Sequence, residues 1–391
     1  MTDGTDGTRG DAAPGDASND AASDGGSRDP APGDDTTLRE FSLDLNDPLA
    51  TARGEITTRR GLLVGVERRG VRGVGEATPL PGWTEPFEEC LAALAGTDGG
   101  PPLDVPADPS PGTVDLGDVP ETPAARHGLA LARLDAAARR QGESLAARLV
   151  DGSRLDGKAP GDRIPVNATV GDAPPDETAG AVRRAAAAGF PCVKVKVGVG
   201  SVARDVERLR AARAAVGDDV DLRADANGAW DRETAVEAVG ALRPLALDYV
   251  EQPLPASDLD GHRALRGRGV RVALDESLVD AGIEPVLARD AADVVVLKPM
   301  ALGGPDRAVA AARRSHAAGV DPVVTTTVDA AVARTAAVHV AAAIPDVGPC
   351  GLATRSLLAD DLAPDPVPVE GGRIGVPAGP GLAGGTFDGL V

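Results

Sequence analysis

The feature that most constrains the fold of this chain is a regular alternation of strand-like and helix-like segments from residue 164 onward. Runs rich in Val and other apolar residues lie at 164–170, 192–197, 220–225, 248–251, 271–275, 293–298, 321–327 and, more weakly, 347–352. Segments rich in Ala, Arg and Leu with helical periodicity lie between them, such as 176–188, 202–215, 231–243, 304–317 and 329–343. Because strands that alternate with helices form parallel sheets, seven or eight such units predict a closed α/β barrel of the TIM type. No GxGxxG motif follows the first run, which argues against a Rossmann fold.

The sequence before this region has a different character. Residues 1–36 consist mostly of Asp, Gly, Ser, Ala and Pro, and a segment with so few large apolar residues is expected to be disordered. From Leu38 the stretches REFSLDLN and GLLVGVERR alternate apolar and polar residues. A turn at Gly70 to Gly73 leads from the second stretch into VGEATPL. This pattern predicts a small antiparallel sheet.

Helical and loop segments connect this sheet to the barrel region. The stretch EPFEECLAALAG predicts a short helix that ends at Gly96. Residues 97–119 are rich in Pro, Gly and Asp and predict a loop. Residues 123–150 have the composition and periodicity of one long helix or two.

The charge balance limits the partners of the chain. Asp and Glu total 60 against 40 Lys and Arg, which gives a net charge of −20. Nucleic acids and anionic membranes bind basic surfaces, so neither is an expected partner. An Asp-rich, Lys-poor chain with 2% aromatic residues is typical of a halophilic protein from a salt-rich cytoplasm. A soluble acidic protein without that adaptation is the alternative.

The cysteines and the apolar runs indicate the compartment. Cys90, Cys192 and Cys350 are widely spaced and form no CxxC motif, so we expect neither a disulfide framework nor a cysteine-based metal site. No apolar run reaches about 18 residues, and no signal-peptide pattern opens the sequence. We therefore expect a cytoplasmic protein without a segment inserted into a membrane. The oligomeric state stays open.

Polar residues recur at the C-terminal ends of five successive strand-like runs. They are Lys194 and Lys196 in CVKVKVG, Asp225 in VDLRAD, Glu251 in DYVE, Asp275 and Glu276 in RVALDE, and Lys298 in DVVVLK. In TIM-type barrels the C-terminal ends of the strands form the active site. The sequence therefore predicts that these ammonium and carboxylate groups share one cavity.

The lysines in this group are rare in the chain. Only four lysines occur, at positions 158, 194, 196 and 298, and all other basic side chains apart from histidine are Arg. Alternation along VKVKV places Lys194 and Lys196 on one face of the strand and the valines on the other. Two lysines that point into a barrel are costly to bury unless they are paired or neutral, which favours a functional role. A half-exposed strand with solvated lysines is the alternative for this stretch alone.

The carboxylates of this group predict a metal site. Asp225, Glu251 and Asp275 stand at gaps of 26 and 24 residues, in the same register of neighbouring strands. Clustered carboxylates repel one another unless a cation lies between them, and an all-oxygen set favours a hard cation such as Mg²⁺. Asn227 and Glu276, which follow two of these carboxylates, would support the ligands or orient a lysine. Separate strand-end caps are the alternative for each carboxylate.

A divalent cation beside a lysine suits removal of the proton α to a carboxylate. The base must be neutral, and a nearby ammonium and a bound cation both disfavour the charged form of a lysine. We therefore predict Lys196 as the general base, with Lys194 as the neighbouring charge. Arginine could not replace Lys196, because a guanidinium does not give up its proton in a protein.

The chain resembles the enolase superfamily, in its muconate-lactonizing-like subgroup. The resemblance rests on KVKV, DANGAW, EQPL, LDES and LKPMALGG, at the ends of five successive strands, and covers the chain outside the N-terminal tail. It implies a modified (β/α)7β barrel at 126–359. It also implies an α+β capping domain at 37–125, which is completed by about 360–391.

The same resemblance implies roles for the strand-end residues. Asp225, Glu251 and Asp275 would bind Mg²⁺, for which Mn²⁺ would substitute. Lys196 would act as general acid and base. Lys298 would stabilise charge from the opposite face of the substrate.

Further stretches resemble o-succinylbenzoate synthases. They are PLATARGEITTRRGLLVGV, GVGEATPLPGWTE and CGLATRSLLADDL. This resemblance implies a metal-dependent carbon–oxygen lyase, or hydro-lyase, of menaquinone biosynthesis. Its substrate would be a small carboxylate, 2-succinyl-6-hydroxy-2,4-cyclohexadiene-1-carboxylate, which a syn dehydration converts to 2-succinylbenzoate.

Three residues are candidates for binding this substrate. Trp83, in PLPGWTE, would pack on the ring of the substrate from a loop that closes over it, or would be an ordinary core residue. Arg223 shares the inward face of its strand with Asp225, so it would bind a carboxylate or complete a layer of the barrel. Thr326, near the end of the 321–327 run, is the third candidate.

Other reactions stay open at this point. N-succinylamino acid racemases keep both lysines, and other epimerases and cycloisomerases share the scaffold. The stretch VVTTTVDAA lacks the His expected of mandelate-racemase-like enzymes, and CGLATRS lacks the Asp-x-Asp pair expected of dipeptide epimerases. An aldolase of a different class would use one lysine as a Schiff-base nucleophile, which leaves the three carboxylates unexplained.

Overall fold

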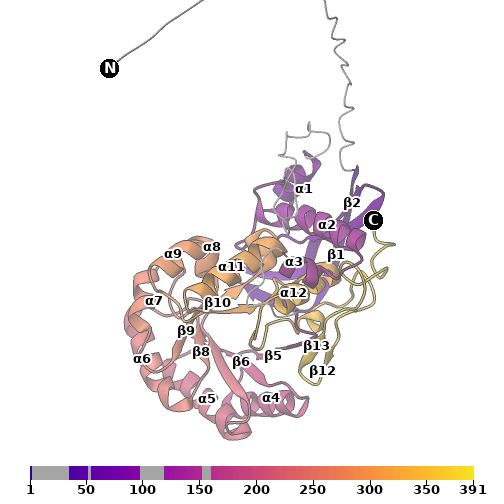
Figure 1. Ribbon diagram of the computed structural model, residues 1–391. Helices are drawn as coiled ribbons and strands as arrows, with labels where there is room; N and C mark the ends of the chain where they lie inside the picture. The colour runs from indigo at the N-terminus through magenta and orange to yellow at the C-terminus, as the bar shows by residue number, and fades with distance from the viewer. Residues whose placement is uncertain (2–34, 52–53, 97–118, 152–159) are drawn as a thin grey trace, which may run out of the picture. The chain divides into compact units, whose positions relative to one another are not determined.

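The computed structural model describes the chain apart from residues 2–34, 52–53, 97–118 and 152–159 (Figure 1). The predicted disordered tail and the predicted loop at 97–119 lie almost wholly outside the described residues, as does Lys158. The first described strand begins at Asp35, so the predicted tail overlaps it by two residues.

The first part of the fold is a three-stranded antiparallel sheet of β1 (Asp35–Thr51), β2 (Gly54–Arg68) and β3 (Val71–Ala77). Residues 61–66 of β2 and 73–77 of β3 are all buried, so both faces of this part of the sheet are covered. The predicted turn at Gly70 to Gly73 is wrong in its extent. The turn occupies Arg69 and Gly70, both with positive φ, and Gly73 already pairs with Val66 inside β3.

Three helices follow this sheet: α1 (Phe87–Ala95), α2 (Pro123–Gln141) and α3 (Leu145–Asp151). The short helix ends at Gly96 as predicted, and the 123–150 segment forms two helices. Helix α2 lies on β3 (Figure 1) at very short range, because Gly73 and Gly75 have no side chains. A Cβ atom at Gly75 would lie 1.9 Å from the carbonyl oxygen of Gly128 in α2.

The second part is the barrel sheet, whose seven parallel strands follow one another in sequence order. They are β5 (Asn167–Val170), β6 (Cys192–Lys196), β7 (Asp221–Asp225), β8 (Tyr249–Glu251), β9 (Arg271–Leu274), β10 (Val294–Leu297) and β11 (Asp321–Val324). The predicted weak eighth strand joins the two edges of this sheet. Cys350 bridges Val166 beside β5, and Gly351 bridges Thr325 beside β11, both in parallel. These bridges confirm the barrel predicted from the sequence.

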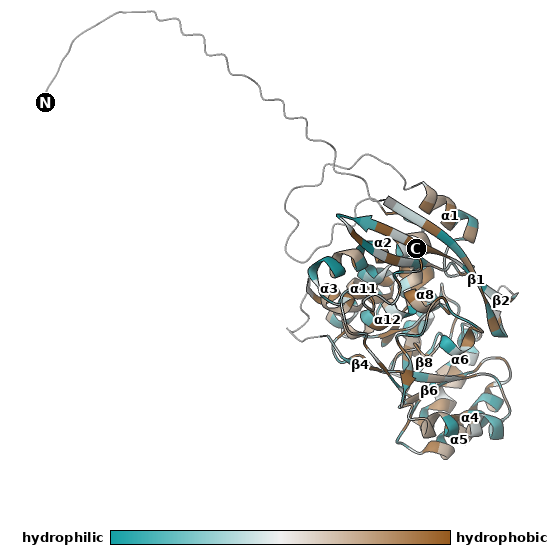
Figure 2. Cartoon of the chain, turned by 90° about the vertical axis from the view of Figure 1, so that its right-hand side faces the viewer, coloured by the Kyte–Doolittle hydropathy of each residue, from teal (hydrophilic) through white to brown (hydrophobic). Residues whose placement is uncertain are grey.

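Helices surround the curled sheet (Figure 1). The predicted helices appear as α4 (Pro175–Ala187), α5 (Val202–Val216), α6 (Arg232–Leu242), α11 (Pro305–Ala317) and α12 (Ala331–Ala342). Four shorter helices were not among the predictions: α7 (Leu259–Leu265), α8 (Glu276–Asp280), α9 (Ile283–Ala288) and α10 (Pro299–Leu302). Figure 2 shows hydrophilic and hydrophobic patches side by side on α4 and α5, as expected of helices with one buried face.

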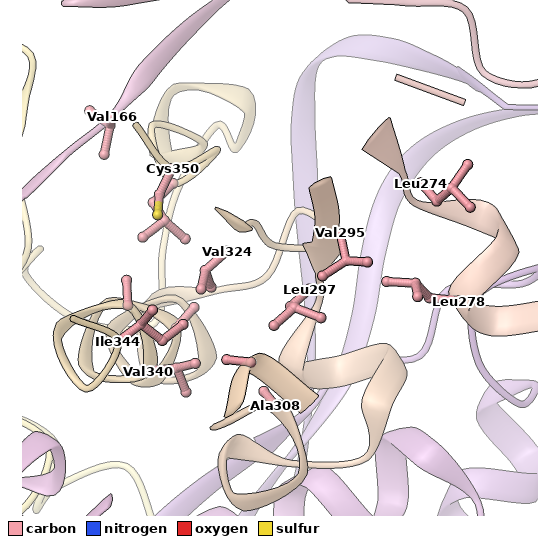
Figure 3. Close-up of a cluster of buried hydrophobic side chains, with 14 of the residues drawn as sticks. Val166, Leu274, Leu278, Val295, Leu297, Ala308, Val324, Val340, Ile344 and Cys350 are labelled. Carbon is pink, nitrogen blue, oxygen red and sulfur yellow. The ribbon is translucent and has the colours of Figure 1, made fainter. Parts of the chain in front are cut away.

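A continuous apolar layer between the strands and the outer helices holds the barrel together. Figure 3 shows part of it, with Val295 and Leu297 of β10 near Ala308 of α11, and Val340 of α12 close by. Cys350 lies near Val166 and Val324 in the same view. Cys350 and the other two cysteines are buried and unpaired, as predicted.

The last part of the chain returns to both regions. The strands β12 (Val369–Glu370) and β13 (Arg373–Gly375) form a small antiparallel sheet with β4 (Arg163–Pro165). Beyond them, the carbonyl of Leu390 accepts a hydrogen bond from Arg39 of β1, so the C-terminal segment contacts the N-terminal sheet. The domain limits at 36, 125 and 359 remain predictions. Among the described helices, none is both long and apolar enough to span a bilayer.

Candidate active site

The strand-end residues predicted from the sequence converge on neighbouring strands. Lys196 of β6 is the register partner of Asp225 in β7, and Asp225 is the partner of Glu251 in β8. Asp275 and Lys298 directly follow β9 and β10. Because parallel strands end on the same side of the sheet, all five residues lie at the C-terminal end of the barrel.

Lys194 lies between two of the carboxylates. Its Nζ is 2.9 and 3.1 Å from the two side-chain oxygens of Glu251 and 2.9 Å from Oδ2 of Asp225. Burial disfavours the charged ammonium, but Asp225 and Glu251 outweigh it and raise the pKa of Lys194 well above its ordinary value. Lys194 is therefore held in its charged form between these two carboxylates, and its predicted role in the reaction stays a prediction.

Lys196 is the most accessible of the three lysines, with 35% of its side chain exposed. Its Nζ donates to Oδ2 of Asp225 at 2.7 Å and to Oδ1 of Asn227 at 2.7 Å. Asn227 in turn donates from Nδ2 to Glu276 at 3.1 Å. Glu276 therefore orients Lys196 through Asn227 and does not contact it in a hydrogen bond of its own.

Lys298 follows β10, which three strands separate from β6, and it is more enclosed, with 11% of its side chain exposed. Its Nζ is 2.5 Å from Oδ2 of Asp275. The indole of Trp83 covers it from the N-terminal part of the chain, with the ring centroid 3.2 Å from Nζ. Trp83 is half-buried and contacts a lysine of the site. Whether it also packs on the ring of a substrate stays a prediction.

The carboxylates carry strong and opposed electrostatic effects. Burial alone would raise the pKa of Asp225, yet Lys194 and Lys196 outweigh it and lower that pKa. Burial and the neighbouring Asp225 raise the pKa of Glu251 to about 7. Burial, opposed by Lys298 and reinforced by Glu276, raises the pKa of Asp275 to about 6. The lysines thus outweigh the effect of burial at Asp225, whereas burial dominates at Glu251 and Asp275.

The oxygen atoms of Asp225, Glu251 and Asp275 are the kind of ligand that a hard divalent cation prefers. Within the described residues no three acidic, His or Cys side chains stand together as a ready-made site, and Lys194 lies between Asp225 and Glu251. However, Oδ1 of Asp275 is buried and accepts no hydrogen bond. Buried carboxylate oxygens require a hydrogen-bond donor or a cation. Three all-oxygen side chains on adjacent strands, one with an unused buried oxygen, are suitable ligands for Mg²⁺.

Gln252 is a supporting residue that the sequence analysis did not identify. It follows Glu251, has a φ of 40° and is fully buried. Its Oε1 accepts hydrogen bonds from the backbone N–H groups of Asp275 and Ser277, at 3.0 and 3.2 Å. Gln252 thereby fixes the backbone that carries the Asp275 carboxylate. The motif EQPL contains this residue, but its partners only become visible in the fold.

A buried ion pair on α5 supports the strand end that carries Lys196. Arg208 and Asp205 are 0% and 2% exposed and pair at 2.9 Å. Arg208 donates to the carbonyl oxygen of Lys196 at 2.7 Å, and Asp205 accepts from the N–H of Gly198 at 2.8 Å. The pair therefore binds the backbone at two points of the turn after β6, the carbonyl of Lys196 and the N–H of Gly198. Its spacing of three residues on a predicted helix was the only sequence signal for it.

Arg223 and Thr326 do not occupy open positions. The Arg223 side chain is 2% exposed, and its guanidinium donates to Asp248 at 2.9 Å and to the carbonyl of Pro349 at 2.6 Å. It also stacks on Tyr249. These contacts engage Nε and Nη1 of Arg223 within the barrel, and its role as substrate ligand or barrel-layer residue stays a prediction. Thr326 is 6% exposed, and its hydroxyl pairs with that of Thr354.

One family model matches most of the barrel region. Residues 177–386 match the family described as Enolase C-terminal domain-like. The match begins in α4 and continues through the strand ends that carry the lysines and carboxylates. It therefore includes every residue of the site except Trp83 and its neighbours.

Two curated relatives each match about half of the chain. An o-succinylbenzoate synthase from Thermobifida fusca is 43% identical over 217 residues, which span 54% of this chain and 66% of that protein. A chloromuconate cycloisomerase from Cupriavidus necator is 34% identical over 192 residues, which span 48% of this chain and 52% of that enzyme. The chain thus matches less than two thirds of the length of either relative.

Among solved structures, a dipeptide epimerase from Methylococcus capsulatus in complex with Mg and the dipeptide L-Arg-D-Lys is similar over 89% of this chain and 98% of its own. The TM-score is 0.73 and the sequence identity 27%. The similarity therefore extends over both parts of the fold. The similar proteins are named a synthase, a cycloisomerase and an epimerase, so these similarities do not select one reaction.

Proposed function

Because the chain belongs to the Enolase C-terminal domain-like family, we propose that it is an o-succinylbenzoate synthase of menaquinone biosynthesis. The reaction would be the syn dehydration of 2-succinyl-6-hydroxy-2,4-cyclohexadiene-1-carboxylate to 2-succinylbenzoate. The observation that carries this proposal is the arrangement of one accessible and one enclosed lysine around buried carboxylates. The 43% identity to the Thermobifida fusca enzyme supports the choice of reaction.

The metal of the proposed enzyme would be Mg²⁺. Asp225, Glu251 and Asp275 would hold it, with Gln252 fixing the backbone of the last ligand. The ion would neutralise charge on the carboxylate of the substrate. Asn227 and Glu276 would keep Lys196 beside this group without binding the ion themselves.

Lys196 would perform both proton transfers. Its neutral Nζ would take the proton from the carbon α to the substrate carboxylate, and the electron pair of that C–H bond would move toward the carboxylate. When the new ring double bond forms, the C–O bond to the hydroxyl breaks. The protonated Nζ would return its proton to the departing hydroxyl, which leaves as water. A single residue can serve in both steps because the proton and the hydroxyl leave from the same face.

Lys298 would contribute charge from the other side. Three strands separate it from β6, Trp83 encloses it and Asp275 pairs with it, so its position is fixed before substrate binds. Preorganised positive charge in a water-poor site stabilises the negative charge that develops in the transition state. The indole of Trp83, at the same place, would contact the ring of the substrate.

The decisive experiment is a direct comparison of substrates with the purified protein. We expect Mg²⁺-dependent aromatisation of the cyclohexadiene substrate, with a much lower rate of racemisation for N-succinyl amino acids. EDTA should abolish turnover, and added Mg²⁺ or Mn²⁺ should restore it. Turnover that survives exhaustive chelation would contradict the metal-dependent mechanism.

The same assay separates the rival reactions. A racemase with two lysine bases would exchange the α-proton of N-succinyl amino acids with solvent deuterium faster than it dehydrates the cyclohexadiene. A Schiff-base aldolase would form a covalent adduct with a carbonyl substrate that borohydride traps. Either result would replace the proposed dehydration.

A further inference from the structure

Arg59 is a buried arginine that the proposed chemistry does not use. It lies on β2 and is 3% exposed. Its guanidinium donates three hydrogen bonds, all to backbone carbonyls: Nη2 to Thr78 at 2.8 Å, Nη1 to Pro79 at 3.0 Å and Nε to Val328 at 3.2 Å. Thr78 and Pro79 lie 19 and 20 residues after Arg59 in the sequence, whereas Val328 lies 269 residues after it. The acceptors therefore belong to two segments that are far apart in the sequence. Arg59 therefore ties two distant segments together.

The first segment carries Trp83. It leaves β3 at Thr78 and turns back on itself, with the N–H groups of Trp83 and Thr84 both donating to the carbonyl of Leu80. At its far end, Glu85 accepts from the N–H groups at the start of α2, at 2.8 and 3.0 Å. Arg59 holds the near end and Glu85 the far end. The indole that covers Lys298 is thus carried on a turn fixed on both sides.

The second segment follows β11 and includes Thr326. Within it, Val328 has a φ of 61°, a conformation that a β-branched residue rarely adopts. Such backbone strain persists only where the surroundings hold it in place. The carbonyl of Val328 is the one that Nε of Arg59 binds. Arg59 is therefore one of the groups that maintain the strained turn beside the site.

The charges around Arg59 explain why a cation is needed there. Glu76 and Asp329 are 0% and 2% exposed, and both act on Arg59 electrostatically. Glu76 accepts from the N–H groups of Ala330 and Ala333, at 2.9 and 2.8 Å, at the start of α12. The two carboxylates and Arg59 thus form a buried charged group between the N-terminal sheet and the barrel.

We propose that Arg59 is a positioning residue that couples the Trp83 turn to the segment after β11 and so determines how firmly Trp83 covers Lys298. Arg59 lies beneath the turn and contacts neither lysine. Loss of its three hydrogen bonds would release the Trp83 turn and the Val328 turn together. The enclosure of Lys298 would then become intermittent. This inference uses the proposed function only for its kinetic consequence.

The test uses Trp83 as its own probe. The chain has two tryptophans, so Trp230→Phe leaves Trp83 as the single indole. In that background we expect Arg59→Lys to shift the emission of Trp83 to longer wavelength and to raise its quenching by acrylamide at least twofold. The kcat/KM for dehydration should fall by about 10- to 100-fold, mostly through KM, because a misplaced positioning group loosens substrate binding more than it alters the chemistry.

A matched control is the neighbouring arginine of the same strand. Arg60 has 45% of its side chain exposed and pairs with Glu40 and Glu88 on the surface. Arg60→Lys in the same background should leave the emission and quenching of Trp83 unchanged. An effect of equal size at both positions would mean that any basic residue of β2 acts alike, and would overturn the proposal.

Two further measurements keep the proposal testable if Arg59→Lys folds poorly. Arg59→Met combined with Asp329→Asn removes one charge of each sign, and it should increase the quenching of Trp83 as the single variant does. In the Trp230→Phe protein itself, the fluorescence anisotropy of Trp83 should decay with the tumbling of the whole molecule. Unchanged quenching in a folded Arg59 variant, or a dominant subnanosecond decay in the parent, would overturn the proposal. None of these readouts requires turnover, so they stand if the proposed reaction is wrong.

Discussion

Two lysines of the proposed site, Lys196 and Lys298, are supported in different ways. Lys196 is held from within the barrel, because the buried pair Asp205–Arg208 of α5 fixes the turn behind it. Its side chain stays 35% exposed. Lys298 pairs with Asp275 of the barrel but is also covered from outside the barrel, by the Trp83 turn, and is 11% exposed.

This difference matches the two kinds of work that the site would do. A group that moves a proton must reach the substrate and change its protonation state, so its backbone needs rigidity and its side chain needs access. A group that stabilises charge works best when it is enclosed and fixed before the reaction. The barrel alone supplies the first, and the N-terminal part of the chain is needed for the second.

The largest change in activity is expected from substitutions of Lys196. Lys196→Ala should lower kcat by about 10³- to 10⁴-fold, since general acid–base catalysis contributes at least that order when one residue acts twice. Lys196→Arg should be equally inactive, because a guanidinium keeps its proton. Calorimetry should show that both variants still bind Mg²⁺. Turnover within tenfold of the parent in either variant would remove Lys196 from its proposed role.

Lys298 should respond differently to the same substitutions. Lys298→Ala should lower kcat by about 10²- to 10³-fold, the usual cost of losing one preorganised donor. Lys298→Arg retains a positive charge and should recover part of that loss. The comparison of the two arginine variants is therefore the sharpest distinction between proton transfer and charge stabilisation. Equal inactivity of both arginine variants would indicate that Lys298 also transfers protons, as in a racemase.

A smaller effect should follow from weakening the support on α5. Asp205→Asn retains the shape of the side chain but removes the charge opposite Arg208, so the turn after β6 should loosen. We expect kcat to fall about tenfold, within the range that a small displacement of a reacting group produces. The emission of Trp83 should not change, because its turn is held elsewhere. Asp172→Asn is the control, since Asp172 also contacts Arg208, at 3.2 Å, but is 30% exposed and makes no contact with the Lys196 turn.

The smallest effect is a change of stability with pH that concerns neither lysine. Burial lowers the pKa of His339 in α12 from 6.5 to about 4. Its Nδ1 accepts from the N–H of Ala146 and its Nε2 donates to the carbonyl of Leu382, so the neutral form is fixed by its partners. Between those two pH values the unfolded chain binds the proton and the folded chain does not. The free energy of unfolding should therefore fall as pH drops through this window, by up to ~3 kcal/mol.

His339→Gln should remove that part of the acid sensitivity, because a glutamine both accepts and donates at similar places. The measurement is urea unfolding of parent and variant at several pH values between 4 and 6.5. His262, whose pKa burial also lowers to about 4, should leave the variant with a remaining acid sensitivity of similar size. Parallel curves for parent and variant would show that His339 does not titrate in this window.

The barrel was predictable because its signals are local. Runs such as CVKVKVG and DVVVLK predict strands from their own residues. In a barrel of parallel strands, the residue at the C-terminal end of each strand then lies at the same end of the barrel. The eighth strand gave a weak pattern because only Cys350 and Gly351 pair there. The short helices α7 to α10 were missed because segments of four to seven residues are too short to show helical periodicity.

The supports of the site were not predictable, because each depends on partners that are distant in sequence. Nothing in the sequence distinguishes Arg59 from the other arginines of its strand, because its partner Val328 is 269 residues away. The contact between Trp83 and Lys298 joins residues from different parts of the fold. Arg223 had the correct inward orientation in the sequence, but only the positions of Asp248 and Pro349 show that its charge is already engaged.

The scarcity of lysine has a practical consequence for labelling. Reagents that modify primary amines usually react at many places on a protein surface. Here three of the four lysines belong to the site, and Lys196 is the most exposed of those three. Among the three lysines of the site, reductive methylation or acylation should therefore reach Lys196 first. The loss of activity per incorporated label would count the working active sites in a preparation.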